Sequence, residues 1–144
     1  MAIAQAVANS FKQEILEGIH NFETGATGDV FKLALYTSDA NLSAATTAYS
    51  VTNEVGDSGE YSAGGGVLQG QQTGLDTGVA IVDFDDLSFT GVTLTARGAL
   101  IYNTSESNKA VCVLDFGSDK TATSGTFTIQ FPAFTSAAAI LRIA

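Results

Sequence analysis

The chain has 144 residues, of which 45% are hydrophobic and only 15% are charged, and this composition excludes disorder along the whole chain. Its formal net charge is −9, and its six basic residues are scattered rather than clustered. Nucleic-acid binding and attachment to an anionic membrane both need a basic surface, so we expect neither nucleic acid nor membrane as a partner.

The first twenty residues show the periodicity of a helix. Val7, Phe11, Ile15 and Ile19 recur at every fourth position and form one apolar stripe. Gly18 and the "NFETGATG" segment that follows would end the helix. We therefore predict an N-terminal amphipathic helix over 1–20. Its stripe needs a surface to cover, because so short a helix is marginal in water.

The N-terminal segment does not resemble a targeting signal. Its apolar stretch has no basic region before it and is broken by Lys12 and Glu14. No segment of the sequence has enough consecutive apolar residues to span a bilayer. We therefore expect a protein that is made and folded in a reducing cytoplasm.

From Val30 onward the apolar period changes to two, which is typical of β-strands. The segment "VFKLALYT" places Phe31, Leu33 and Leu35 on one face and polar or small residues on the other. Short strands with turn residues between them predict an all-β fold, an antiparallel, jelly-roll-like β-sandwich over 30–144 within a single domain of residues 1–144. The predicted strands are 30–37, 79–84, 87–96, 97–103, 109–116, 125–131 and 138–144, and the predicted turns are 85–86, 103–108 and 117–125.

One segment departs from this pattern. Residues 39–78 are rich in Ala, Thr, Ser and Gly, and a structureless loop of that length is unusual in a compact domain. We predict an irregular arm with weak strands around "AYSVTNEV" and "GGVLQG", either as an edge hairpin or as a projecting arm. The "AGGGVLQG" run matches neither glycine-rich phosphate-binding motif, so we interpret it as a bend or a close backbone approach.

Residues that could carry catalysis are few. The "DFG" at 115–117 reproduces a kinase motif, but the chain lacks H-R-D and is too short for two lobes, so we predict the end of a strand. His20 is the only histidine and is predicted to suit a helix C-terminus. Cys112 is the only cysteine, which excludes an intrachain disulfide, and it is predicted to be a buried small apolar residue. We predict no catalytic residue, no cofactor and no enzymatic activity.

The carboxylates of "VDFDD" stand close enough in sequence to chelate a hard cation. Asp83, Asp85 and Asp86 nevertheless lack the D-x-D-x-D-G loop and distal glutamate of a calcium site, and aspartates at a strand end usually form turns. No metal site is predicted, and the sequence leaves open whether these three aspartates bind a cation. Asp83 and Asp115 as a glycosidase pair are disfavoured, because the chain has no tryptophan to form a sugar platform.

Several strands carry apolar residues on both faces. A sheet with one face in water should alternate apolar and polar residues, so the second face must be covered as well. We predict that the N-terminal helix covers part of it and that a neighbouring subunit covers the rest, in a homodimer or homotrimer. The predicted interface residues are Ala99, Ile101, Val111, Val113 and Ile140.

The chain resembles a family of small virion structural proteins of tailed bacteriophages. The segments that carry the resemblance are "FKLALYTSDANLSAATTAYS", "NEVGDSGEYSAGGGVL", "TARGALIYN", "KAVCVLDFGSDK" and "FTIQFP…AILRIA". None of these motifs is catalytic, so the resemblance assigns no functional residue. It implies a β-sandwich subunit of a virus particle that is assembled in the cytoplasm of the bacterial host.

Placement on the head is favoured, because small acidic jelly-roll proteins often serve as cement or decoration on capsid lattices. The expected partners are then other copies of the chain and the major capsid protein. A tail, neck, fibre or baseplate component is the alternative within the virion. A carbohydrate-binding or surface-binding β-sandwich module is a further alternative.

Overall fold

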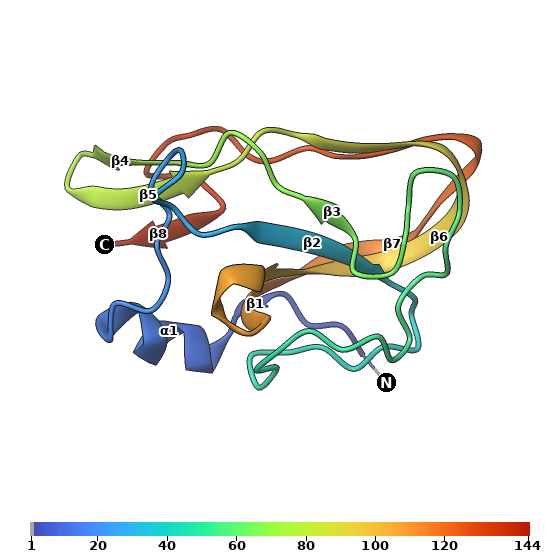
Figure 1. Cartoon of the computed structure of the whole chain (residues 1–144), viewed down its shortest axis with the longest axis horizontal. Coiled ribbons are helices and arrows are strands. Elements are labelled where there is room, and N and C mark those ends of the chain that lie inside the picture. Colours follow the sequence, from blue (N-terminus) through green and yellow to red (C-terminus); the bar gives the residue numbers. More distant parts are fainter. Residues whose placement is uncertain (1) are drawn as a thin grey trace.

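The structure, a computed structural model that describes residues 2–144, contains two antiparallel sheets and one short α-helix (Figure 1). One sheet has five strands in the order β1-β7-β6-β2-β3, and the other has three in the order β4-β5-β8. The predicted all-β sandwich with an N-terminal helix is confirmed, and the jelly-roll arrangement stays a prediction. The elements are β1 (Ala6–Val7), α1 (Asn9–Leu16), β2 (Phe31–Tyr36), β3 (Gly66–Val67), β4 (Gln72–Asp76), β5 (Val79–Asp83), β6 (Leu87–Asn103), the short 3-10 helix η1 (Thr104–Glu106), β7 (Lys109–Ile129) and β8 (Leu141–Ile143).

The N-terminal helix is shorter than predicted. The residues before it form β1, because the free edge of β7 offers their backbone hydrogen-bond partners. The helix ends at Leu16, and Gly18 follows with a positive φ of 71°, as its place in the sequence predicted. Part of the predicted apolar stripe is preserved, since Val7, Phe11 and Ile15 line one common surface. Within residues 2–144, no helix has the length and apolar character needed to cross a membrane.

Strands β6 and β7 form one long hairpin that bends and takes part in two layers of the molecule. They have 17 and 21 residues, so segments 87–96 and 97–103, predicted as separate strands, are one strand. The pairing slips at four places along β6, and such bulges allow a ribbon to bend. In Figure 1 the hairpin runs beside β2, turns at one end and returns over it as the upper layer. We call 97–103 and 109–116 the inner half, and 87–96 and 120–129 the outer half.

The prediction of a turn at 117–125 is wrong. At the bend Gly98 pairs with Asp115, and Ala96 pairs with Lys120. Between these two pairs β7 therefore contains more residues than β6, and the extra residues form a bulge. Gly117 takes a positive φ of 82°, and its N–H donates to the Asp115 carboxylate at 2.9 Å. The "DFG" is therefore a bulge inside a strand rather than a strand end. Glycine and aspartate suit a bulge as well as a chain reversal, and for this reason the sequence signal was ambiguous.

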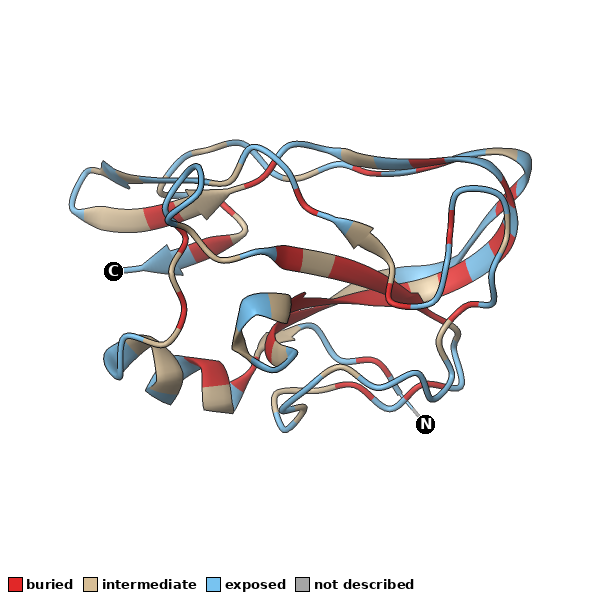
Figure 2. Ribbon diagram, viewed as in Figure 1, coloured by how far each residue is buried: buried red, intermediate tan, exposed pale blue. Residues whose placement is uncertain are grey.

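Both faces of the inner sheet are covered by the chain itself. On the face of Leu33 the outer half of the hairpin packs down, and a Cβ on Gly66 would lie 3.0 Å from the Phe89 ring. On the opposite face, Tyr49 stacks on Tyr102 with a ring-centroid distance of 4.7 Å. Figure 2 shows the result, with buried residues concentrated along β2 and the inner half of the hairpin.

Residues 39–78 do not project as an arm. Leu42 pairs with Ile3 in a parallel bridge, and this pair of segments lies over the second face of the inner sheet. The predicted weak strand around "GGVLQG" is confirmed as β3, whereas "AYSVTNEV" forms only isolated bridges such as Ala48 with Lys109. Strand β4, also within this segment, was not predicted. The segment is irregular because it follows the surface of a sheet and does not pair along its length.

The predicted interface is corrected by this covering. Ala99, Ile101, Val111 and Val113 are each 0% exposed in the single chain, and Ile140 is partly buried against the core. The strands with apolar residues on both faces are indeed covered on both faces. The cover is supplied by the outer half of the hairpin, the N-terminal segment and residues 40–50, so the first four side chains are not available to a neighbour.

Candidate functional site

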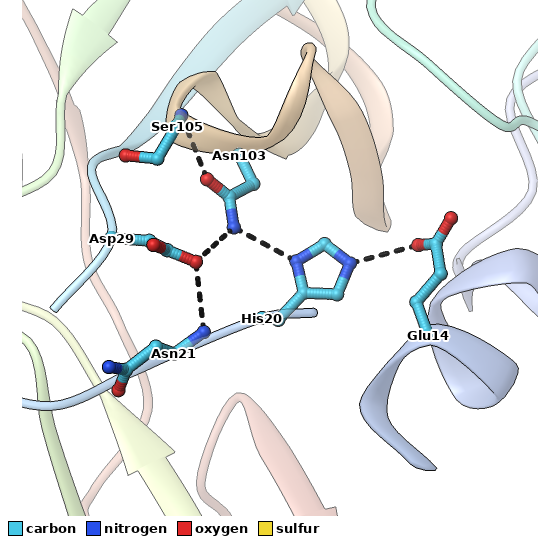
Figure 3. Close-up of polar contacts among 6 residues, drawn as sticks. All are labelled: Glu14, His20, Asn21, Asp29, Asn103 and Ser105. Atoms are coloured by element: carbon cyan, nitrogen blue, oxygen red, sulfur yellow. Dashed lines mark hydrogen bonds and ion pairs between the residues drawn. The ribbon is translucent and has the colours of Figure 1, made fainter. Parts of the chain in front are cut away.

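The first polar cluster lies between α1 and the end of β6 and is centred on His20 (Figure 3). His20 Nε2 lies 2.9 Å from Glu14 Oε1, and His20 Nδ1 lies 3.0 Å from Asn103 Nδ2. The Asn103 amide also donates to Asp29 Oδ2 at 2.8 Å, and its Oδ1 accepts from Ser105 N–H at 3.0 Å. His20 follows the helix and contacts the Glu14 side chain, so the predicted interaction with the helix C-terminus is wrong.

The protonation pattern of this cluster follows from its donors. The Asn103 amide nitrogen, Nδ2, can only donate hydrogen bonds, so His20 Nδ1 must accept one from it. His20 Nε2 then carries the ring proton and donates it to Glu14. Both ring nitrogens are thereby occupied, and the His20 side chain is 0% exposed. An imidazole in this state has no free nitrogen with which to activate a nucleophile. The cluster is arranged to fix the helix and η1 to the sheet.

We expect replacement of Asn103 by leucine, which has a similar shape, to lower the free energy of unfolding by about 3 kcal/mol. The change leaves His20 Nδ1 without its donor, removes one of the two donors to Asp29 Oδ2 (the Asn21 N–H remains, at 2.9 Å) and removes the cap of η1. Urea denaturation measures the loss. Asn41→Leu, at an exposed position, is the matched control and should shift stability by no more than about 0.5 kcal/mol. Equal stability of the two variants would show that the Asn103 bonds contribute nothing.

The second polar cluster joins all four tyrosines of the chain to the segment around Glu54. The Tyr49 and Tyr61 hydroxyls donate to the two oxygens of Glu54 at 2.6 and 2.7 Å, and the Gly64 N–H donates to it at 2.7 Å. The Tyr102 hydroxyl donates to the Gly64 carbonyl at 2.5 Å. The fourth, Tyr36, donates to the Ser50 carbonyl at 2.6 Å. These bonds attach residues 49–64 to the inner sheet.

Burial raises the pKa of these tyrosines. Desolvation is the main cause for each of them, and it raises the pKa of Tyr102 to about 12. The pKa values of Tyr36, Tyr49 and Tyr61 are raised as well, with the nearby Glu54 charge as a further cause. Burial also raises the pKa of the Cys112 thiol to about 12. Cys112 is thus confirmed as a buried small residue, and its thiol is held in the unreactive protonated form.

These shifts predict a protein that is sensitive to alkali. The folded state holds the phenols and the thiol protonated, whereas in the unfolded chain they titrate near pH 10 and 9. The stabilisation is therefore present in full below pH 9 and is lost as the pH rises through 12. We expect the urea midpoint to fall steadily above pH 10, and tyrosinate absorbance to appear together with the loss of β-sheet circular dichroism. Tyrosine ionisation that precedes unfolding would contradict this expectation.

Each of the three aspartates of "VDFDD" has a different structural environment. Asp86 Oδ1 accepts the Phe131 N–H at 2.8 Å and fixes the chain where it leaves β7. The Asp85 carboxylate lies directly against Gly70, where a Cβ would collide with it. Asp83 Oδ1 is buried without a hydrogen-bond partner. Within residues 2–144, no group of three or more His, Cys, Asp or Glu side chains is gathered to hold a metal ion.

An open apolar groove lies between α1 and the β4-β5-β8 sheet, with a volume of about 550 Å³. By the strand register, Leu75, Ala80 and Ile143 form one row across that sheet, and Thr73, Val82 and Leu141 form the next. The other wall consists of Val7, Phe11 and Ile15, with Phe22 behind them. Most of this lining is apolar, so the groove is the best candidate for a binding site.

The rim of this groove exposes large apolar side chains and two cations. Of the lining residues, Leu16 is 87% exposed and Ile143 is 58% exposed, which is unusual for residues of this size. Leu75, 80% exposed, lies outside the lining but next to Ala80 on the same face of the sheet. Lys12 also lines the groove, and Arg142 contributes to the lining from β8, although its pairing with Ile81 directs its side chain to the opposite face of the sheet. Within residues 2–144 the carboxylates that contact a basic side chain are Glu14, hydrogen-bonded to His20, and Asp115, paired with Arg97, so neither Lys12 nor Arg142 is paired with a carboxylate.

Sequence reasoning found part of the groove and none of the polar clusters. The stripe of Val7, Phe11 and Ile15 was predicted to need a surface, and it forms one wall of the groove. Glu54 and Asn103 were missed, because nothing in their neighbours along the chain sets them apart. Comparison of the chain with protein-family models, with curated proteins and with solved structures finds no match.

Proposed function

We propose that this protein is a non-enzymatic structural protein of a tailed-phage virion, and that it serves as a cement or decoration protein that stabilises the head lattice. The observation that carries the proposal is the apolar groove between α1 and the β4-β5-β8 sheet, with Leu16 and Ile143 exposed along it. A protein that acts by contact needs such a surface, since burial of apolar area is the main source of association free energy.

Three further observations support an interaction role. His20 has both ring nitrogens occupied within the fold, and the Cys112 thiol is buried and protonated. The chain covers both faces of its inner sheet, so it is a self-contained subunit that can be added to a lattice. The resemblance of its sequence segments to small phage virion proteins gives the proposal its biological setting. The proposed partners are the major capsid protein and, within the lattice, other copies of this chain.

Quantitative mass spectrometry of purified phage particles tests this proposal. A cement protein should be present in a number comparable to the capsid subunits, on the order of hundreds of copies in a symmetric shell. A few dozen copies or fewer would place the protein in the tail or neck instead. Absence from particles that package DNA normally would overturn the virion assignment altogether.

A further inference from the structure

We infer that the groove between α1 and β8 binds an extended segment of another protein, a segment in which apolar side chains alternate with carboxylates. The inference rests on the proposed function, because it names the chemistry of the partner at the same surface. Three independent features of the groove specify this partner: a free strand edge, an apolar floor and unpaired cations.

The free edge is that of β8. In the three-stranded sheet β8 pairs only with β5, and no other backbone hydrogen bond involves Leu141–Ile143 within residues 2–144. In the view of Figure 1, β8 lies between β5 and α1. Unpaired backbone groups on an edge strand are a template for another extended chain, which would add a fourth strand to this sheet.

The apolar floor suits the side chains of such a strand. Alternate residues of an added strand point to the same side, and on this side Ile143, Ala80 and Ile15 line the groove and are not fully buried. Because β8 has only three residues, few backbone bonds can form, and side chains in the groove must supply most of the affinity. The partner segment therefore needs apolar residues at alternate positions.

The unpaired cations specify the charge of the partner. Lys12 lies in the groove, with Nζ 3.4 Å from Asn9 Oδ1. Arg142 pairs with Ile81, so its side chain points to the face of the sheet opposite Ala80 and Ile143, where Nη1 donates to the Ser136 and Ala137 carbonyls at 3.4 and 2.8 Å. One cation thus faces the groove and a second lies on the opposite face of β8, where the alternate side chains of an added strand would point, in a protein with 15 acidic residues. Carboxylates on the partner would neutralise them.

A second copy of this chain fits the groove less well. A two-fold contact would bring the same patch of both copies together and place Lys12 and Arg142 of one copy beside those of the other. The occupant is accordingly a different polypeptide.

The test uses protein-observed NMR on the full chain, which detects weak binding and locates it. The probes are short capped peptides in which valine alternates with glutamate, valine with lysine, or serine with glutamate. We expect the Val/Glu peptide to shift amide signals of α1, β5 and β8 and to bind about tenfold more tightly than either of the others. Dodecanoate serves as a non-peptide probe that combines an apolar chain with a carboxylate.

Variants separate the contribution of the cations from that of net charge. Lys12→Glu combined with Arg142→Gln should abolish the preference for the Val/Glu peptide over the Val/Lys peptide. Lys109→Glu combined with Lys120→Gln makes the same change in net charge away from the groove and should leave the preference intact. Arg142→Gln retains a donor toward Ala137, so the loop before β8 stays closed.

Several outcomes would overturn the inference. Equal binding of the Val/Glu and Val/Lys peptides removes the charge argument, and shifts that lie outside the groove remove the site. Saturable binding of dodecanoate with no peptide binding would make the groove a site for amphiphiles. These results come from the purified chain, so they are distinguishable from a failure of the virion assignment, which the copy number in particles decides.

Discussion

Replacing Gly65 by alanine is expected to lower the free energy of unfolding by about 4 kcal/mol, one of the largest losses from a single methyl group in this fold. Gly65 has a positive φ of 81°, which strains any other residue. The added Cβ would also collide with the Leu33 carbonyl oxygen and lie 2.8 Å from Ala34 Cα. Both contacts are with the backbone of β2, which cannot move without disturbing the centre of the sheet.

Gly78 provides the matched control for this prediction. It has almost the same φ, 84°, but a Cβ there would meet nothing within 4 Å. Gly78→Ala therefore carries the conformational strain alone, about 1 kcal/mol. Urea denaturation of the two variants separates strain from steric collision. Similar losses at the two positions would mean that β3 adjusts easily and that the close approach to β2 is not required.

Replacing Glu54 by alanine is expected to destabilise the fold by about 3 kcal/mol, because three donors lose one acceptor group. The Tyr49 and Tyr61 hydroxyls and the Gly64 N–H all bind this carboxylate. Tyr61 is fully buried, so water cannot readily replace the lost bond. Glu54→Gln keeps the shape and one acceptor oxygen, and should lose about half as much.

A second measurement makes the Glu54 prediction specific. Combining Glu54→Ala with Tyr61→Phe should cost clearly less than the sum of the two single changes, because both remove the same bond. Hydrogen exchange at the Gly64 amide should also accelerate in Glu54→Ala, since that N–H loses its acceptor. Additive losses with unchanged exchange would show that the cluster does not anchor this segment.

The prediction of the fold succeeded where the signal was local. Alternating residues such as Phe31, Leu33 and Leu35 identified β2, and the turn residues at 85–86 and 103–108 fall between strands as predicted. The turn at 117–125 was wrong, because a glycine with positive φ serves a bulge as readily as a chain reversal. The helix was predicted too long, because a β-edge that lies far away in sequence captured its first residues.

The predicted interface illustrates a second limit. The sequence of Ala99, Ile101, Val111 and Val113 correctly indicated strands buried on both sides. It could not indicate what buries them, because a strand needs the same apolar residues whether a segment of its own chain or a neighbouring subunit covers it. The cover over one face came from Ile3, whose helical periodicity gave no sign of this contact, and from Leu42 and Tyr49, which lie in a segment with no regular periodicity.

By itself, the sequence determined the all-β class, the absence of a basic surface and the amphipathic stripe that lines the groove, since each depends on composition or on near neighbours. The tertiary structure alone decided which side chains meet. Asn103 contacts His20 across 83 residues and Asp29 across 74 residues, and the groove joins a helix at one end of the chain to a strand at the other. Hydrogen bonds and burial depend on distance in space. Folding brings together residues that are far apart in the chain, and no periodicity or motif in the neighbouring sequence indicates that they will meet.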